Sequence, residues 1–303
     1  LGDVYKRQVP GIGMAMNSFT RPGDKVMIQP PVYHPFAWVT TRNERTLVTN
    51  PLKWENGMYR MDLDAFREQV KGCKLFILCN PHNPGGVVWT EDELRTVAEI
   101  CYEEKVLVFS DEIHADLTLP PYKHRPFATI SEKAKMNSVT FMSPSKAFNM
   151  PGLAASHAII FNEDLRARFR KFMDAGELDM GHVFAFLSVE AAYTHGTEWL
   201  DQCLAYIQGN IDYVDNFLKT HAPRIKAIRP QASYLVWLDC RELGLNQEAL
   251  NDFFADKAHL ALNDGAMFGK EGTGYMRLNV ASPRSVIEQA MKQLAEAYQA
   301  MSF

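Results

Sequence analysis

Five short runs of consecutive apolar residues restrict the fold of this sequence more than any other feature. They fall within residues 25–29, 74–79, 106–110, 139–142 and 157–161. Uninterrupted runs of this length are typical of strands covered on both faces, as parallel strands are when helices flank the sheet. Because helical patterns separate some of the runs, the sequence predicts an α/β fold with a mostly parallel sheet flanked by helices.

The clearest helical pattern covers residues 90–105, between the second and third runs. Thr90 and Glu93 have the spacing of a capping box, and apolar residues recur behind them at helical intervals. A strand, a helix and another strand in this order favour a right-handed parallel crossover. The pattern therefore supports the parallel sheet.

The character of the sequence changes after residue 163. Residues 163–220 are largely helical in pattern, and residues 234–240 and 275–280 are predicted strands of a second unit. An amphipathic helix with Ser285 as its N-cap closes the chain. We therefore expect a smaller α+β domain at the C-terminus.

Composition excludes several classes of function. The 303 residues carry a net charge of −4 with dispersed Lys and Arg, so neither nucleic acid nor a membrane surface is an expected partner. No apolar stretch approaches the roughly 18 residues that a membrane span needs. Five cysteines without a C-x-x-C pair indicate reduced thiols in a cytoplasmic protein. Nine histidines without H-x-x-x-H spacing predict no metal site.

Polar and aromatic residues follow the first four runs. In open α/β sheets, ligands bind beyond the carboxyl ends of the strands, and those ends meet at one edge. Taken alone, each residue has an ordinary structural explanation, such as a turn, a helix cap or the surface. Their joint placement predicts one site, and its members are Tyr33, Asn83, Asp111, His114, Ser143, Ser145 and Lys146.

This set of groups meets the requirements of pyridoxal 5′-phosphate (PLP). The cofactor is an aldehyde and needs an amine to condense with, which Lys146 can supply. Its ring nitrogen must stay protonated, and the carboxylate of Asp111 favours that charge. Asn83 can donate to the 3′-oxygen, and Tyr33 can stack on the ring.

The phosphate of the cofactor needs hydroxyl groups and backbone N–H groups. Ser143 and Ser145 offer hydroxyls. The glycine-containing turn at residues 11–13 is expected to enter a helix there, so that Ile12 and Gly13 would present helix-start N–H groups to the phosphate.

With these residues in place, the chain resembles the fold-type-I PLP enzymes of the class I/II aminotransferase superfamily. The matching motifs are NPHNPGG, SDEIHADL, SPSKAFNMPGL and YMRLNVASPR, in that order. The last motif implies that Arg277 grips the α-carboxylate of an amino-acid substrate, for which a guanidinium fork is suited. The resemblance also implies a homodimer for the full-length protein.

Within the superfamily, IQPPVYHPF, DEIH and ALNDGAMFG most resemble the cystathionine β-lyase, or cysteine-S-conjugate β-lyase, branch. This branch implies a PLP-dependent carbon–sulfur lyase, with Tyr33 also near the substrate and His114 near the 3′-oxygen. An ordinary core histidine is the other interpretation of His114. Two alternatives stay open for the function: a class I/II aminotransferase, and a non-catalytic regulatory binding protein.

The resemblance also sets the expected domain boundaries. Residues 1–8 (LGDVYKRQ) do not match the superfamily and are interpreted as a non-native leader. Residues 9–205 are the predicted PLP-binding large domain, incomplete at its N-terminus because relatives begin with a further segment. Residues 206–303 are the predicted small domain.

Overall fold

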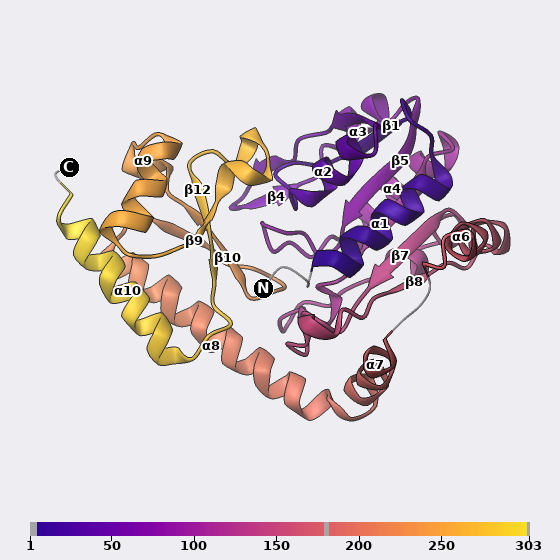
Figure 1. The fold of residues 1–303 in the computed structure, drawn as a ribbon. Helices are drawn as coiled ribbons and strands as arrows, with labels where there is room; N and C mark the ends of the chain where they lie inside the picture. The colour runs from indigo at the N-terminus through magenta and orange to yellow at the C-terminus, as the bar shows by residue number, and fades with distance from the viewer. Residues whose placement is uncertain (1–4, 179–181, 302–303) are drawn as a thin grey trace.

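The computed structural model describes residues 5–178 and 182–301, and its larger sheet has the strand order β2-β1-β5-β6-β7-β8 (Figure 1). Its strands are β1 (Lys25–Ile28), β2 (Thr46–Thr49), β5 (Cys73–Cys79), β6 (Leu107–Asp111), β7 (Ser138–Met142) and β8 (His157–Ile159). The first five of these run parallel, and β8 pairs antiparallel with β7. The predicted mostly parallel sheet is thereby confirmed.

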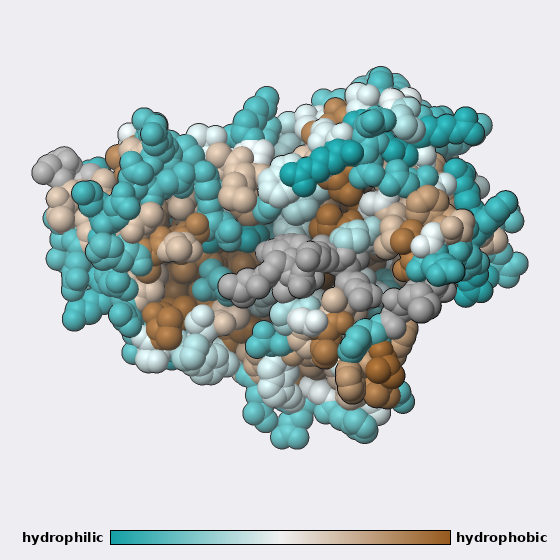
Figure 2. Space-filling view, viewed as in Figure 1, coloured by the Kyte–Doolittle hydropathy of each residue, from teal (hydrophilic) through white to brown (hydrophobic). Residues whose placement is uncertain are grey.

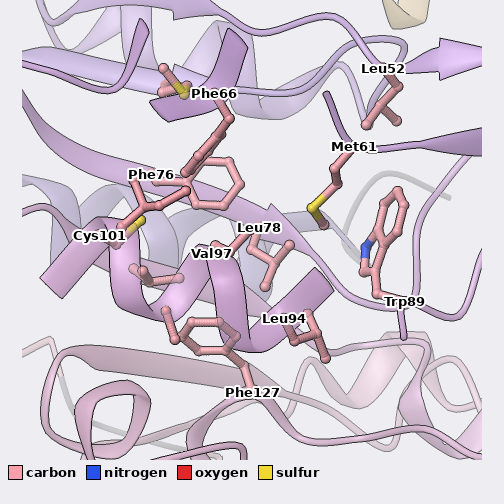
Figure 3. Packing of buried hydrophobic residues seen from close by; sticks show 14 of the residues in the cluster. Leu52, Met61, Phe66, Phe76, Leu78, Trp89, Leu94, Val97, Cys101 and Phe127 are labelled. Atoms are coloured by element: carbon pink, nitrogen blue, oxygen red, sulfur yellow. The ribbon is translucent and has the colours of Figure 1, made fainter. Parts of the chain in front are cut away.

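Helices cover both faces of this sheet. They are α1 (Tyr5–Phe19), α2 (Pro35–Arg42), α3 (Leu63–Gln69), α4 (Glu91–Glu103), α5 (Glu132–Met136) and α6 (Glu163–Ala175). Helix α7 (Val183–His195) follows them and contacts α8. Alternate residues of β5 enter different cores. Phe76 and Leu78 pack with the cluster of α3 and α4 (Figure 3), whereas Leu75 and Ile77 pack with the cluster of α1 and α2. Burial on both faces explains why the strand is apolar without alternation.

The predicted capping box begins α4. The Thr90 hydroxyl accepts a hydrogen bond from the Glu93 amide (3.2 Å), and the Glu93 carboxylate accepts one from the Thr90 amide (2.9 Å). Strand β2 was not predicted from the sequence. It is an edge strand without a fully buried residue, so it has no apolar run.

The second unit is built on a smaller antiparallel sheet of order β11-β12-β10-β9. Its strands are β9 (Lys226–Ile228), β10 (Leu235–Asp239), β11 (Asn263–Asp264) and β12 (Tyr275–Asn279), and its helices are α8 (Thr197–His221), α9 (Gln247–Asp252) and α10 (Arg284–Gln299). The two-stranded hairpin of β3 (Lys53–Glu55) and β4 (Met58–Arg60) stands apart from both sheets. The four-stranded sheet and its helices confirm the predicted smaller α+β unit.

The predicted N-cap of the last helix is wrong. Helix α10 begins at Arg284, so Pro283 holds the cap position and Ser285 lies within the first turn. Pro283 has no side-chain atom that can accept a hydrogen bond, so α10 begins without a side-chain cap.

Helix α8 connects the two units. It contacts α7 at one end and lies along α10 (Figure 1). The predicted domain boundary at residue 205 falls inside α8, and the division into residues 9–205 and 206–303 stays a prediction. Within residues 5–178 and 182–301, no helix has the length and apolar character to cross a membrane.

Candidate active site

One cavity gathers six of the predicted site residues. It lies where the carboxyl edge of the larger sheet meets the smaller sheet. The predicted residues that line it are Tyr33, Asn83, Asp111, His114, Lys146 and Arg277. The first five follow or end β1, β5, β6 and β7, and Arg277 comes from β12. The rule that ligand-binding residues follow parallel strands thus brought five of these six residues to one cavity.

Lys146 is a half-buried amine with an altered proton affinity. Burial lowers its pKa, and the positive charge of Arg277 lowers it further, while the negative charge of Asp111 acts in the opposite direction. A lowered pKa increases the fraction of neutral amine near neutral pH. Neutral amine is the form that attacks an aldehyde and the form that accepts a proton.

The two neighbouring carboxylates at the end of β6 have different surroundings. Asp111 is 3% exposed, lines the cavity and accepts a hydrogen bond from the Ile113 amide at 3.3 Å. Glu112 instead accepts from the Ser110 hydroxyl (2.7 Å) and the Phe127 amide (2.8 Å), and it pairs with a histidine at 2.7 Å. Glu112 therefore serves the packing of the large unit, and Asp111 is the carboxylate that lines the cavity.

Arg277 joins the two units. Its Nη1 donates to the Asn83 side-chain oxygen at 2.9 Å, and its Nη2 donates to the Asn263 side-chain oxygen at 2.8 Å. Its guanidinium carbon lies 4.7 Å from the centre of the Phe268 ring. These contacts fix the plane of the guanidinium fork at the wall of the cavity, where a carboxylate can be bound by two nitrogens.

His114 and Tyr33 are buried in the walls of the cavity. Burial lowers the pKa of His114 to about 3, and the charges of Lys146 and Arg277 add to this effect, so its ring is neutral. In the described part of the chain, its Nδ1 has no hydrogen-bond partner. Tyr33 packs edge-on against Phe36, with ring centres 5.6 Å apart, and this contact positions the phenol ring.

The two serines before Lys146 do not line the same cavity. Their hydroxyl oxygens lie 2.8 Å apart, and the Ser143 hydroxyl donates to the Ala155 carbonyl oxygen. Ser145 lines a second cavity, which adjoins the first. The spacing of residues in the sequence located these serines near Lys146, but their hydroxyls satisfy each other in this structure.

The prediction that residues 11–13 enter a helix is wrong. Helix α1 begins at Tyr5, so Ile12 and Gly13 lie inside it, and their N–H groups are not those of a helix start. Pro10 and the glycines suggested a boundary, but the helix continues through them. Both residues have packing roles instead: Ile12 is fully buried, and a Cβ on Gly13 would lie 3.1 Å from a methyl group of Val39 on α2.

Six further residues that line the cavity were not singled out from the sequence: Cys79, Ile113, Tyr234, Leu235, Asn263 and Asn279. Leu235 and Asn279 are partners in the antiparallel pair of β10 and β12. The carboxyl end of β12 therefore faces the same site as the carboxyl ends of the parallel strands. Asn279, a polar residue at the end of a predicted strand, could have been found from the sequence by the same rule. Burial raises the pKa of the Cys79 thiol, as does the charge of Asp111, so this thiol is neutral.

Similarity to known proteins extends over nearly the whole chain. The model of the family described as aminotransferase class I and II matches residues 10–294. Cystathionine beta-lyase PatB of Bacillus subtilis (strain 168) is 39% identical over 291 residues, which span 95% of this chain and 75% of PatB.

Solved structures agree with this assignment. Cystalysin from Treponema denticola, whose crystal structure contains a pyridoxal 5′-phosphate cofactor, is 35% identical with a TM-score of 0.93, over 97% of this chain and 75% of cystalysin. The PLP-bound C-S lyase from Staphylococcus hominis is 32% identical with a TM-score of 0.89, over 97% of this chain and 77% of that lyase. Since both the family model and the folds match almost throughout, the chain belongs to the aminotransferase class I and II family.

Proposed function

We propose that the protein is a PLP-dependent carbon–sulfur β-lyase. It would cleave cystathionine or another S-conjugate of cysteine, with the uptake of one water molecule, to a thiol, pyruvate and ammonia. The observation that carries this proposal is the single cavity that unites Lys146, Asp111, Asn83 and Arg277. The similarity to PatB and to the two solved structures favours the lyase reaction.

The residues of the cavity fit the cofactor. Lys146 provides an amine whose lowered pKa makes it reactive. Asp111 would hold the ring nitrogen, Asn83 the 3′-oxygen, and Tyr33 the face of the ring. The buried Nδ1 of His114, which has no partner among the described residues, supports a polar ligand atom beside it. For the phosphate, Ser143 and Ser145 stay the proposed ligands. Ile12 and Gly13 lie inside α1, so the helix-start N–H groups for which they were predicted as ligands are not theirs.

The chain's own residues would divide the work of the reaction. When bound, the cofactor supplies an electron sink for the negative charge that develops at the substrate Cα. Arg277 binds the substrate α-carboxylate and fixes the Cα–H bond toward Lys146. Lys146 Nζ removes the Cα proton as a general base, and the thiolate leaves from Cβ with the electrons of the carbon–sulfur bond.

An aminotransferase is the second candidate, because the family includes that activity and the removal of the Cα proton is common to both reactions. The two differ in products. Pyruvate released from L-cystathionine without a keto acid would support the lyase. Amino transfer that needs a keto acid, with no pyruvate from any cysteine thioether, would refute the lyase.

A non-catalytic binding protein is the third candidate. Purified protein mixed with PLP should develop a visible absorbance band that borohydride removes, because Lys146 condenses with the aldehyde. A folded chain that develops no such band would favour a binding role without catalysis.

The five free thiols support the proposal that the protein is cytoplasmic.

We also propose that the protein forms a homodimer. Helix α7 supports this, since Val183, Phe184, Phe186 and Leu187 on it are 56–63% exposed. Figure 2 shows hydrophobic side chains gathered over this helix at the lower right of the molecule. An exposed apolar surface of this kind is typical of an interface between protein chains. Sedimentation of the holoenzyme tests the proposal, and a monomer at micromolar concentration would contradict it.

A further inference from the structure

A second cavity adjoins the active-site cavity on the other side of Lys146. Both cavities share the side chains of Lys146, Tyr234 and Asn279 as a common wall. One face of α8 forms much of the rest, through residues spaced at one and two helical turns: Trp199, Cys203, Tyr206 and Ile207.

The chemistry of this second cavity differs from that of the first. Among the described residues that line it, Lys146 is the one charged side chain, whereas the first cavity also has Asp111 and Arg277. Of the residues that line it, Ile207 is buried, and Trp199 and Tyr206 are about half exposed. The Trp199 ring stacks on Phe148 with ring centres 6.0 Å apart, and this contact positions it.

We infer that the second cavity receives the sulfur substituent of the substrate and favours apolar or aromatic thioethers of cysteine over cystathionine. This inference rests on the proposed lyase function and specifies its substrate class. A substrate whose carboxylate lies on Arg277 must bring its Cα to Lys146, the base. Its sulfur is two bonds beyond Cα, so the substituent lies beside the shared wall.

Charge explains the preference between substrates. The far end of cystathionine carries an ammonium and a carboxylate, which would have to leave water for a cavity whose lining has no carboxylate side chain and no arginine. An aromatic or aliphatic substituent loses no such hydration and gains contact with Trp199 and Ile207. The structure thus assigns the choice of thiol to α8 and the recognition of the amino-acid group to Arg277.

The experiment compares pyruvate release from S-benzyl-L-cysteine, S-methyl-L-cysteine and L-cystathionine by the PLP-loaded protein. Wild-type kcat/KM should be highest for S-benzyl-L-cysteine. Trp199→Ala should lower that value about tenfold and leave S-methyl-L-cysteine nearly unchanged, because a methyl group does not reach the ring. Cys203→Phe, which fills the cavity, should act in the same direction. Tyr102→Ala removes an exposed ring outside both cavities and is the control.

A binding measurement keeps this inference separate from the lyase reaction. The carbon analogue of S-benzyl-L-cysteine, with a methylene in place of sulfur, has no bond to cleave. Its dissociation constant, measured by calorimetry, should rise in Trp199→Ala and Cys203→Phe. Weaker binding without pyruvate release from any substrate would support the cavity assignment and reject the lyase. Pyruvate release that favours cystathionine, or that falls equally for all substrates in both variants, would overturn the cavity assignment and leave the lyase standing.

Discussion

The two units contribute to the active site in different ways. The larger sheet supplies Lys146 and Asp111, which are held at the ends of adjacent parallel strands. The smaller sheet supplies Arg277, which reaches across to Asn83 through one hydrogen bond of 2.9 Å. The proposed chemistry therefore lies in the large unit and the proposed recognition of substrate in the small one. Substitutions in the first should mainly lower kcat, and substitutions in the second should mainly raise KM.

The strongest test of this division is Lys146→Ala. Because Lys146 is both the proposed attachment point and the proposed base, turnover should fall by at least about a thousandfold. The fold should persist, since Lys146 lies in the wall of a cavity, outside the three hydrophobic cores. Pyruvate release and the circular dichroism spectrum measure the two effects, with exposed Lys135→Ala as the control. A rate like that of the wild type would remove Lys146 from the mechanism.

The adjacent carboxylates give the next largest contrast. Asp111→Asn should lower kcat about a hundredfold, since it removes the charge that stabilises a protonated ring nitrogen, and should change the melting temperature little. Glu112→Gln should instead destabilise the fold by about 3 kcal/mol, because it breaks the buried pair with His124. Rates per folded molecule and thermal melts distinguish these results. The opposite pattern would show that Glu112, and not Asp111, serves the ligand.

The small unit is tested by Arg277→Lys. Lysine keeps the positive charge but cannot bind a carboxylate with two nitrogens, so KM should rise about tenfold or more while kcat changes less. Steady-state kinetics with one thioether substrate measure both constants. A fall confined to kcat would place Arg277 with the chemical groups of the large unit and would break the division.

Most of the large-unit site was predictable because its residues follow apolar runs, and parallel strands bring those positions to one edge. The sequence did not predict the reversed direction of β8, since a short apolar run carries no direction. It also misplaced the start of α1. The glycines at residues 11–13 predicted a helix start there, but the helix already begins at Tyr5. Asn263 was missed for another reason: its contact with Arg277 depends on the pairing of β11 with β12, and the chain between these two strands forms two short 3-10 helices that the sequence did not predict.

Asn263 should give a smaller effect than Arg277. Asn263→Ala removes one hydrogen bond to the guanidinium and leaves the bond to Asn83, so KM should rise about fivefold, as expected for a bond of about 1 kcal/mol. The matched control is Asn251→Ala, since that side chain bonds to Asp264 in the same unit and not to Arg277. An equal change in both variants would indicate a general disturbance of the small unit rather than a loss of arginine positioning.

The smallest expected effect is a shift in the pKa of Lys146, on which a residue of each unit acts. Arg277 lowers the pKa of Lys146 and Asp111 raises it. PLP reacts with the neutral amine, so the rate at which the visible band forms should increase with pH through the Lys146 pKa. Arg277→Met removes a lowering influence, and the rate should then rise only at higher pH. Asp111→Asn removes a raising influence, and the increase in rate should then occur at lower pH. Stopped-flow absorbance across pH measures the two shifts, and shifts in the same direction would mean that these charges do not compete at Lys146.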